Sequence, residues 1–212
     1  MPLVLLAALL LAPPTQIYFV RHGETQANAT GKYNSRTVDA FSELGQKQVA
    51  GLTKTLMPMR FDAIVVSPSP RALRTIYPYL HATHQKAVIW PELYECCDAH
   101  SKTRPSLMSK GIRFGAPITL PKDIADAFVL TRGKDHFLQT NSYDDGLKQI
   151  AFAAKNLTAE FPGKRVLVVG HSLHGGRMIE LLQGKPMLGK VRPANCSITH
   201  LTQAGTRFSI SQ

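Results

Sequence analysis

The amino-acid sequence predicts an α/β fold in three layers, with a mostly parallel sheet between two layers of helices. Short apolar runs that suit buried strands alternate along the chain with longer segments in which apolar residues recur at helical spacing. Strands separated by helices usually pair in parallel, because the helix returns the chain to the starting end of the sheet. The last two apolar runs, 196–201 and 206–211, have no helix between them and should form an antiparallel edge near the C-terminus.

The first strand and the first helix are predicted from composition and spacing. Residues 16–20, QIYFV, are largely apolar or aromatic and suit a buried strand. Residues 42–56 place apolar side chains at helical spacing behind Ser42, a residue type that suits the N-cap position. A second strand is predicted at 61–67, FDAIVVS.

The middle of the chain contains one more helix and strand, followed by an irregular stretch. Residues 69–82 predict a helix, which Pro78 should bend. The run KAVIW at 86–90 predicts a short strand. Residues 96–140 are rich in Pro, Gly, Lys and Arg and show little periodicity, so we expect a lid-like excursion there.

The second half returns to regular elements. Residues 143–161 predict a long helix capped by Asn141 or Ser142. The run RVLVVG at 165–170 predicts a buried strand, and residues 175–184 predict the last helix.

The composition is that of a globular protein with a basic surface. The chain has 212 residues, 44% of them hydrophobic, and a net charge of +11 from 25 Lys and Arg against 14 Asp and Glu. This excess favours anionic partners, but the basic residues are scattered and form no run typical of nucleic-acid binding. The three cysteines, Cys96, Cys97 and Cys196, show neither a disulfide framework nor a Cys-x-x-Cys pair. We therefore expect no nucleic-acid partner, no metal and no cofactor.

The N-terminal stretch 3–12, LVLLAALLLA, is apolar but short. A helix that crosses a bilayer needs about 20 residues, so no transmembrane span is expected. The stretch suits the apolar region of an export signal. We expect residues 1–14 to be a signal or hydrophobic N-terminal segment, and 15–212 to be one domain. The protein should then be periplasmic or secreted, with a cytoplasmic location as the alternative.

Polar side chains follow the predicted strands at the point where each strand ends. In open α/β sheets, binding sites form at the carboxyl ends of the strands, so these side chains should converge. They are two arginines, Arg21 and Arg71, two histidines, His22 and His171, and a carboxylate from either Glu92 or Glu95.

The motifs RHGET with Asn28 behind it, SPSPRALRT, LYE and VLVVGH resemble the histidine phosphatase superfamily, the phosphoglycerate-mutase-like group that uses a glutamate as general acid. The resemblance runs from about residue 16 to the end, in the family's order. It implies His22 as a nucleophile that forms a phosphohistidine, and Glu95 as the acid for the leaving oxygen. It also implies that phosphate is bound by two arginines, an asparagine and a histidine: Arg21, Arg71, Asn28 and His171.

These residue types suit phosphate-ester hydrolysis on chemical grounds as well. Neutral imidazole is a nucleophile near physiological pH, and guanidinium groups bind phosphate oxygens bidentately. Neither needs a metal ion. The expected substrate is a small anionic phosphorylated molecule, and phosphate or vanadate should inhibit. Seven basic residues against three acidic ones between 100 and 140 would suit a substrate with additional anionic groups.

Two assignments have local competitors. Glu95 is aligned by its Leu-x-Glu pattern, and Glu92 is the alternative acid. His171 follows its strand directly, as the family's second histidine does, whereas His174 has the two glycines behind it. We favour Glu95 and His171.

Three other functions are alternatives to phosphate-ester hydrolysis. GHSLHGG resembles a lipase nucleophile elbow around Ser172, but it lacks the Gly-x-Ser-x-Gly spacing, and only one acidic residue, Glu180, and one distant histidine, His200, follow it. The mutases of the group carry Asn-Glu-Arg-His-Tyr-Gly around their acid, and here the sequence is LYECCDAH. A non-catalytic module that binds phosphorylated ligands is a further alternative. The sequence does not indicate an oligomeric state.

Overall fold

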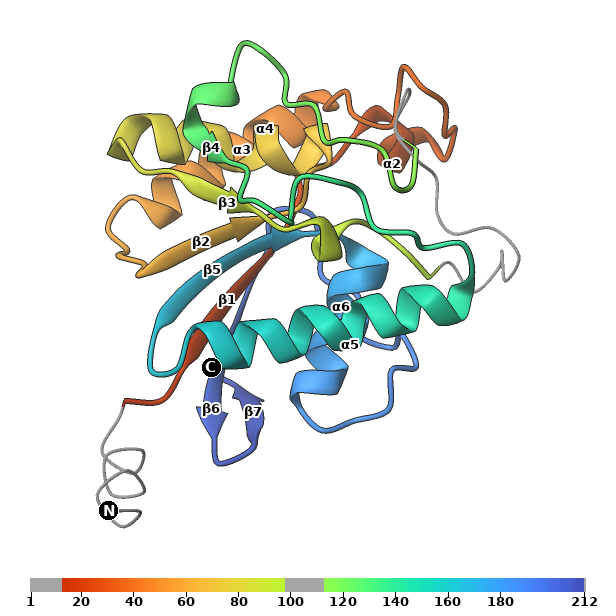
Figure 1. Cartoon of the computed structure of the whole chain (residues 1–212). Helices are drawn as coiled ribbons and strands as arrows, with labels where there is room; N and C mark the ends of the chain where they lie inside the picture. Colours follow the sequence, from red (N-terminus) through yellow and green to blue (C-terminus); the bar gives the residue numbers. More distant parts are fainter. Residues whose placement is uncertain (1–12, 98–112, 212) are drawn as a thin grey trace.

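The computed structural model describes residues 13–97 and 113–211, and these form a single mixed sheet with helices on both faces (Figure 1). In this part of the chain the sheet has seven strands, in the spatial order β4 (Phe128–Val129), β3 (Ala87–Ile89), β2 (Ala63–Val66), β5 (Arg165–Gly170), β1 (Gln16–Arg21), β6 (Ile198–Ala204) and β7 (Arg207–Ile210).

Among the described strands, five neighbours pair in parallel, and the last two pairings are antiparallel. The pairs β1–β5, β2–β5, β2–β3 and β3–β4 are parallel, whereas β1–β6 and β6–β7 are antiparallel. The predicted α/β class and its antiparallel C-terminal edge are confirmed.

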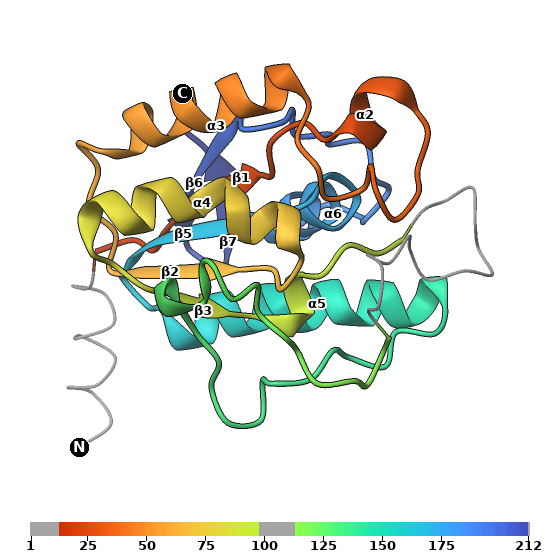
Figure 2. The same ribbon diagram turned by 90° about the horizontal axis from the view of Figure 1, so that it is seen from above.

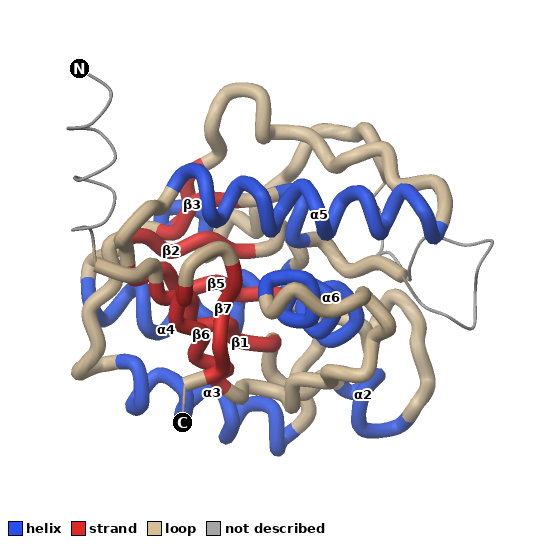
Figure 3. Tube along the Cα trace, turned by 90° about the horizontal axis from the view of Figure 1, so that it is seen from below, coloured by secondary structure: helices blue, strands red, loops and turns tan. Residues whose placement is uncertain are grey.

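Four longer helices of the described residues cover the sheet, two on each face. Figure 2 shows α3 (Glu43–Leu56) and α4 (Pro70–Thr83) on one side and α5 (Tyr143–Glu160) on the other. Figure 3, from below, shows the same order of layers. The helix α6 (Ser172–Leu182) packs on the face that α5 covers. The shorter elements are α2 (Gln26–Thr30), η1 (Pro91–Leu93) and η2 (Ala125–Ala127).

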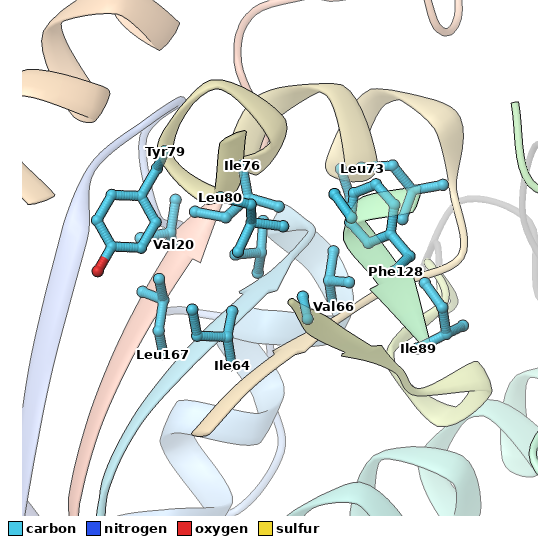
Figure 4. Close-up of a cluster of buried hydrophobic side chains, with 14 of the residues drawn as sticks. Val20, Ile64, Val66, Leu73, Ile76, Tyr79, Leu80, Ile89, Phe128 and Leu167 are labelled. Carbon is cyan, nitrogen blue, oxygen red and sulfur yellow. The ribbon is translucent and has the colours of Figure 1, made fainter. Parts of the chain in front are cut away.

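Alternation along β1 supplies side chains to both layers of the core. Tyr18 and Val20 belong to the cluster under α3 and α4, and Ile17 and Phe19 to the cluster under α5 and α6. Successive strand residues point to opposite faces, so a strand buried on both sides is apolar throughout. Figure 4 shows the first cluster, where α4 side chains such as Leu73, Ile76 and Leu80 lie against strand residues such as Val20, Val66 and Leu167.

The register of the central strands brings their carboxyl ends level. The His22 N–H donates to the Gly170 carbonyl at 3.0 Å, and the Ser67 N–H donates to the Val169 carbonyl at 3.0 Å. Because His171 directly follows Gly170, the residues that leave β1, β2 and β5 begin at the same edge of the sheet.

Two helix caps are as the residue types predicted. Ser42 caps α3 by accepting the Gly45 N–H at 2.9 Å, and Ser142, rather than Asn141, caps α5 by accepting the Asp145 N–H at 3.1 Å. Pro78 lies inside α4, which continues beyond it.

Three local predictions were incomplete. The last helix begins at Ser172, not at 175, because a carboxylate distant in sequence accepts N–H groups of its first turn. The short helix α2 was not predicted; it depends on a capping box between Thr25 and Asn28. The irregular stretch 96–140 contains β4, a two-residue edge strand too short to leave a periodic pattern.

Some predictions fall on parts of the chain that are not described. The export signal expected within 1–14 lies almost entirely outside the described residues, as do residues 98–112 of the expected lid. Within 13–97 and 113–211, no helix combines the length and the hydrophobicity needed to cross a membrane.

The close packing of α6 on β1 predicts a steric effect on stability. A Cβ added at Gly175 would lie 2.0 to 2.7 Å from three ring atoms of Phe19, which is fully buried. Gly175→Ala should therefore lower the free energy of unfolding by about 1–3 kcal/mol, measured by urea denaturation.

The matched control is Gly51→Ala, on the exposed side of α3, where an added Cβ meets nothing within 4 Å. This change should leave stability unchanged or raise it by up to about 1 kcal/mol, because alanine favours a helix over glycine. Equal effects of the two substitutions would contradict the packing argument.

Candidate active site

A cavity of about 390 Å³ opens beyond the carboxyl ends of the central strands. Its wall combines residues from the end of β1, the loop and helix that follow, the start of α4, the segment after η1 and the first turn of α6. The lining residues are Arg21, His22, Thr25, Asn28, Tyr33, Val38, Arg71, Glu95, Ser172 and Leu173. Of the six site residues that the family resemblance implies, Arg21, His22, Asn28, Arg71 and Glu95 line the cavity and His171 does not.

His22 is a neutral imidazole with one unprotonated ring nitrogen. Its Nδ1 lies 2.8 Å from the Gly23 carbonyl, which can only accept, so Nδ1 carries the proton. The Nε2 atom accepts from Arg71 Nε at 3.3 Å. Burial, with the Arg71 charge adding to it, lowers the pKa of His22 well below its usual value. The lone pair on Nε2 is therefore present at neutral pH, as a nucleophile requires.

Arg71 lies in the first turn of α4 and is almost completely buried. Its Nη1 forms a salt bridge with Asp39 at 3.1 Å. The hydroxyl of Thr75, one turn further along, accepts the Gly23 N–H at 2.9 Å and donates to the Arg71 carbonyl at 2.7 Å. The threonine of the SPSPRALRT motif thus connects α4 to the loop that carries His22.

Arg21 is the second guanidinium in the wall. Its Nη1 donates to the Pro193 carbonyl at 3.0 Å, and burial lowers its pKa from the ordinary value. The segment after Pro193 supports the same region, because Asn195 Nδ2 donates to the His22 carbonyl at 2.8 Å and the Cys196 N–H donates to the Arg21 carbonyl at 2.9 Å.

Glu95 sits at the N-terminus of α6. Its Oε1 accepts the His174 N–H at 2.8 Å and the Cys96 N–H at 3.2 Å, while among the described residues Oε2 accepts the Leu173 N–H alone, at 3.4 Å. Burial nevertheless raises the pKa of Glu95, against the opposing effects of the helix N–H groups and of the arginines. The less engaged Oε2 is the oxygen better able to carry a proton.

The structure separates the two glutamates that compete in the sequence. Glu92 does not line the cavity; it is buried elsewhere, paired with Lys134 at 3.4 Å and accepting from Asn156 Nδ2 at 3.0 Å. Only Glu95 of the two is in the cavity wall.

The two histidines are also placed differently. His171 is fully buried, its ring in edge contact with the His22 ring at a centroid distance of 5.2 Å. Its Nε2 lies 2.8 Å from Ser67 Oγ. Burial first, and then the Arg71 charge, lower the pKa of His171 well below the usual value. His174 is buried as well, and its backbone N–H contacts Glu95.

Asn28 and Tyr33 form the outer part of the wall. Asn28 Nδ2 donates to the Tyr33 hydroxyl at 3.3 Å, and Asn28 Oδ1 accepts the Thr25 N–H at 3.2 Å. Tyr33 is about half exposed.

Sequence reasoning missed several residues of the site. Thr75 lay inside the SPSPRALRT motif that was matched to the family, so a signal was available for it. Tyr33, Val38 and Leu173 carried no local signal, because only the folded chain brings them to the cavity.

The vicinal cysteines pack beside the site. Cys96 and Cys97 are both buried and free, with their sulfur atoms 2.6 Å apart, and they contact α5 at Gly146 and Tyr143. Across the described residues, no cluster of three or more His, Cys, Asp or Glu side chains has an arrangement that could hold a metal ion.

Comparisons with known proteins confirm the resemblance read from the motifs. Residues 17–110 match the model of the histidine phosphatase superfamily (branch 1). An adenosylcobalamin/alpha-ribazole phosphatase of Salmonella typhi is 34% identical over 80 residues, which are 38% of this chain. The matched stretch spans about two fifths, 40%, of that relative's own length.

Solved structures extend the likeness to nearly the whole chain. The alpha-ribazole phosphatase from Shigella flexneri has a TM-score of 0.64 at 20% identity and covers 92% of this chain and 94% of its own. A phosphoglycerate mutase from Bacillus anthracis has a TM-score of 0.60 at 21% identity, with 94% and 92% covered. At these identities the likeness shows the fold, which phosphatases and mutases share.

The burial of neutral histidines predicts how stability depends on pH. Burial lowers the pKa of His174 from 6.5 to about 4. Between these values the unfolded chain binds a proton there that the folded chain does not, so stability falls as the pH decreases. His174→Gln should reduce the slope of the unfolding free energy against pH, between pH 4 and 6.5, by up to about 1.4 kcal/mol per pH unit.

Urea denaturation at a series of pH values measures this slope. The control is His81→Gln, on the exposed face of α4, which should keep the slope of the wild type. An unchanged slope in His174→Gln would show that this histidine does not take part in acid destabilisation.

Proposed function

We propose that this chain, whose residues 17–110 carry the histidine phosphatase family pattern, is a phosphomonoester hydrolase that acts through a phosphohistidine intermediate on a small phosphorylated substrate. One observation carries the proposal. His22 presents an unprotonated Nε2, beside Arg71 Nε, in the wall of a cavity that also contains Arg21 and Glu95. A nucleophile, two phosphate-binding cations and a carboxyl group with a raised pKa therefore share one site.

In the first step, His22 Nε2 attacks phosphorus and the bond from phosphorus to the ester oxygen breaks. The leaving oxygen takes the proton of the Glu95 carboxyl group, so an alcohol departs and Glu95 becomes a carboxylate. Arg21 and Arg71 stabilise the charge on the equatorial oxygens, a role in which guanidinium groups replace metal ions.

In the second step, the Glu95 carboxylate takes a proton from water as the water oxygen attacks phosphorus. The bond between phosphorus and Nε2 breaks, inorganic phosphate leaves, and His22 and Glu95 return to their starting forms. Asn28 adds a hydrogen bond at the rim, and His171 adds one beside His22. Because Arg21 and Arg71 supply the positive charge at the phosphoryl oxygens, turnover should be independent of metal ions.

The substrate is proposed only as a class. The basic stretch between 100 and 140 suggested a substrate with additional anionic groups, but no described residue of 113–140 lines the cavity. Lys134, for example, is occupied by Glu92, Glu160 and the Trp90 ring. Export to the periplasm or medium is likewise proposed from residues 3–12 alone.

The alternative functions differ from phosphate-ester hydrolysis in the residues that they require at the site. A mutase would return the phosphoryl group to its substrate, and this chain has Cys96 and Cys97 after its glutamate in place of the mutase motif. A lipase-type site would require a histidine on Ser172, and in the described structure no histidine hydrogen-bonds the Ser172 hydroxyl. A binding module would need no group that protonates a leaving oxygen.

Trapping the intermediate tests the proposal directly. Rapid quench with a labelled aryl phosphate should place the label on His22, stable to alkali and labile to acid, in the presence of EDTA. His22→Ala should abolish both labelling and turnover.

The matched variant is Ser172→Ala, which removes the other candidate nucleophile in the same wall and should still be labelled. Label that persists in His22→Ala, or turnover that EDTA abolishes and zinc restores, would refute the mechanism.

The role of Glu95 is tested through the leaving group. An alkoxide needs a proton to depart, whereas nitrophenolate needs little help. Glu95→Gln should therefore lose about 10²- to 10⁴-fold in kcat/KM on alkyl phosphates and much less on nitrophenyl phosphate.

Glu92→Gln serves as the comparison, because Glu92 is buried outside the cavity and should show no dependence on the leaving group. Equal losses on both substrates in Glu95→Gln would assign Glu95 to phosphate positioning or to the fold. A selective loss in Glu92→Gln would make Glu92 the acid.

A further inference from the structure

Ser67 is buried beside the site without lining the cavity. It directly follows β2, its side chain is fully inaccessible, and its Oγ lies 2.8 Å from His171 Nε2. Its backbone N–H is fixed by the Val169 carbonyl. The strand register therefore determines where the hydroxyl meets the histidine ring.

The direction of this hydrogen bond follows from the second partner of Ser67. Its Oγ also accepts the Ser69 N–H, at 3.3 Å. Among the described residues, His171 Nε2 is then the one acceptor within reach of the hydroxyl proton. If Nε2 instead carried the proton, the Ser67 O–H would be a buried donor without an acceptor, which folded proteins avoid.

The state of His171 limits where its proton can be. The ring is fully buried close to Arg71 and His22, so it is neutral and carries a single proton. If Nε2 accepts from Ser67, that proton is on Nδ1. Nδ1 is buried and has no hydrogen-bond partner in the described part of the structure.

We infer that Ser67 is a positioning residue that holds His171 in the tautomer with the proton on Nδ1, so that this ring donates a hydrogen bond to a phosphoryl group on His22. The donor function rests on the proposed phosphatase mechanism, whereas the tautomer does not. In the opposite tautomer, Nδ1 would present a lone pair to anionic oxygens and repel them. The serine thus selects the form of the histidine that attracts phosphate.

The chain contains a matched control two residues away. Ser69 is also fully buried, it is the N-cap residue of α4, and its hydroxyl has no partner among the described residues. Ser67→Ala and Ser69→Ala remove the same atom from neighbouring buried sites, but only the first removes a contact with His171.

Nitrogen NMR of the protein with ¹⁵N-labelled histidine measures the tautomer without turnover. The His171 signals are assigned by their loss in His171→Asn. The wild type and Ser69→Ala should show His171 protonated on Nδ1. Ser67→Ala should show the Nε2-protonated form or a mixture of both forms. Ser67→Thr, which keeps the hydroxyl, should show the wild-type form.

Two results would overturn the inference: a wild type protonated on Nε2, or a His171 tautomer that Ser67→Ala leaves unchanged.

Inorganic phosphate and vanadate extend the test to the site. Adding either anion to the wild type should shift the His171 Nδ1 resonance. Ser67→Ala should weaken vanadate inhibition and lower kcat about tenfold or more, because a functional histidine loses the partner that orients it. Ser69→Ala should be inhibited as the wild type is. If no phosphate ester is hydrolysed, the proposed function fails, while the tautomer in the free protein still decides this inference. Equal loss in both serine variants would reduce Ser67 to a packing role.

Discussion

The alignment of three parallel strands is the constraint on which the site depends. Because β1, β2 and β5 end level, His22, Ser67 and His171 emerge side by side at one edge of the sheet. A shift of one residue in any of these strands would turn its side chains to the opposite face. The apolar residues that precede each polar one are buried on both faces of the sheet, where close packing favours one arrangement of side chains over a shifted one. The polar site is thus positioned by the hydrophobic core.

Burial of charge is the second feature that shapes the chemistry. Arg71 has Asp39 beside it, whereas the described partner of the Arg21 head group is a backbone carbonyl. Desolvation lowers the pKa of Arg21 and His22, and raises that of Glu95. A phosphoryl group carries the charge that complements the guanidinium groups, and low effective dielectric strengthens that attraction. The same burial that destabilises these charges suits them to bind an anion and to move a proton.

Much of the site was predictable because its motifs immediately follow strands. Arg21 and His22 follow β1, Arg71 opens α4 after β2, and His171 follows β5, so local patterns were sufficient to place them. The local Leu-x-Glu pattern favoured Glu95 over Glu92, but it could not place either side chain. Glu95 lies in the cavity wall because N–H groups in the first turn of α6 hold its carboxyl group, a contact across 79 positions of sequence.

The sequence by itself determined the order of the elements, the parallel sheet with its antiparallel edge, and the residue types at the strand ends. Each of these follows from apolar periodicity and caps, which act over a few neighbouring residues. The tertiary structure alone decided that α6 begins at Ser172, that Tyr33 and Leu173 line the cavity, and that Ser67 meets His171. Such contacts join segments far apart in the chain, and their geometry depends on strand register and helix packing, which no local pattern encodes.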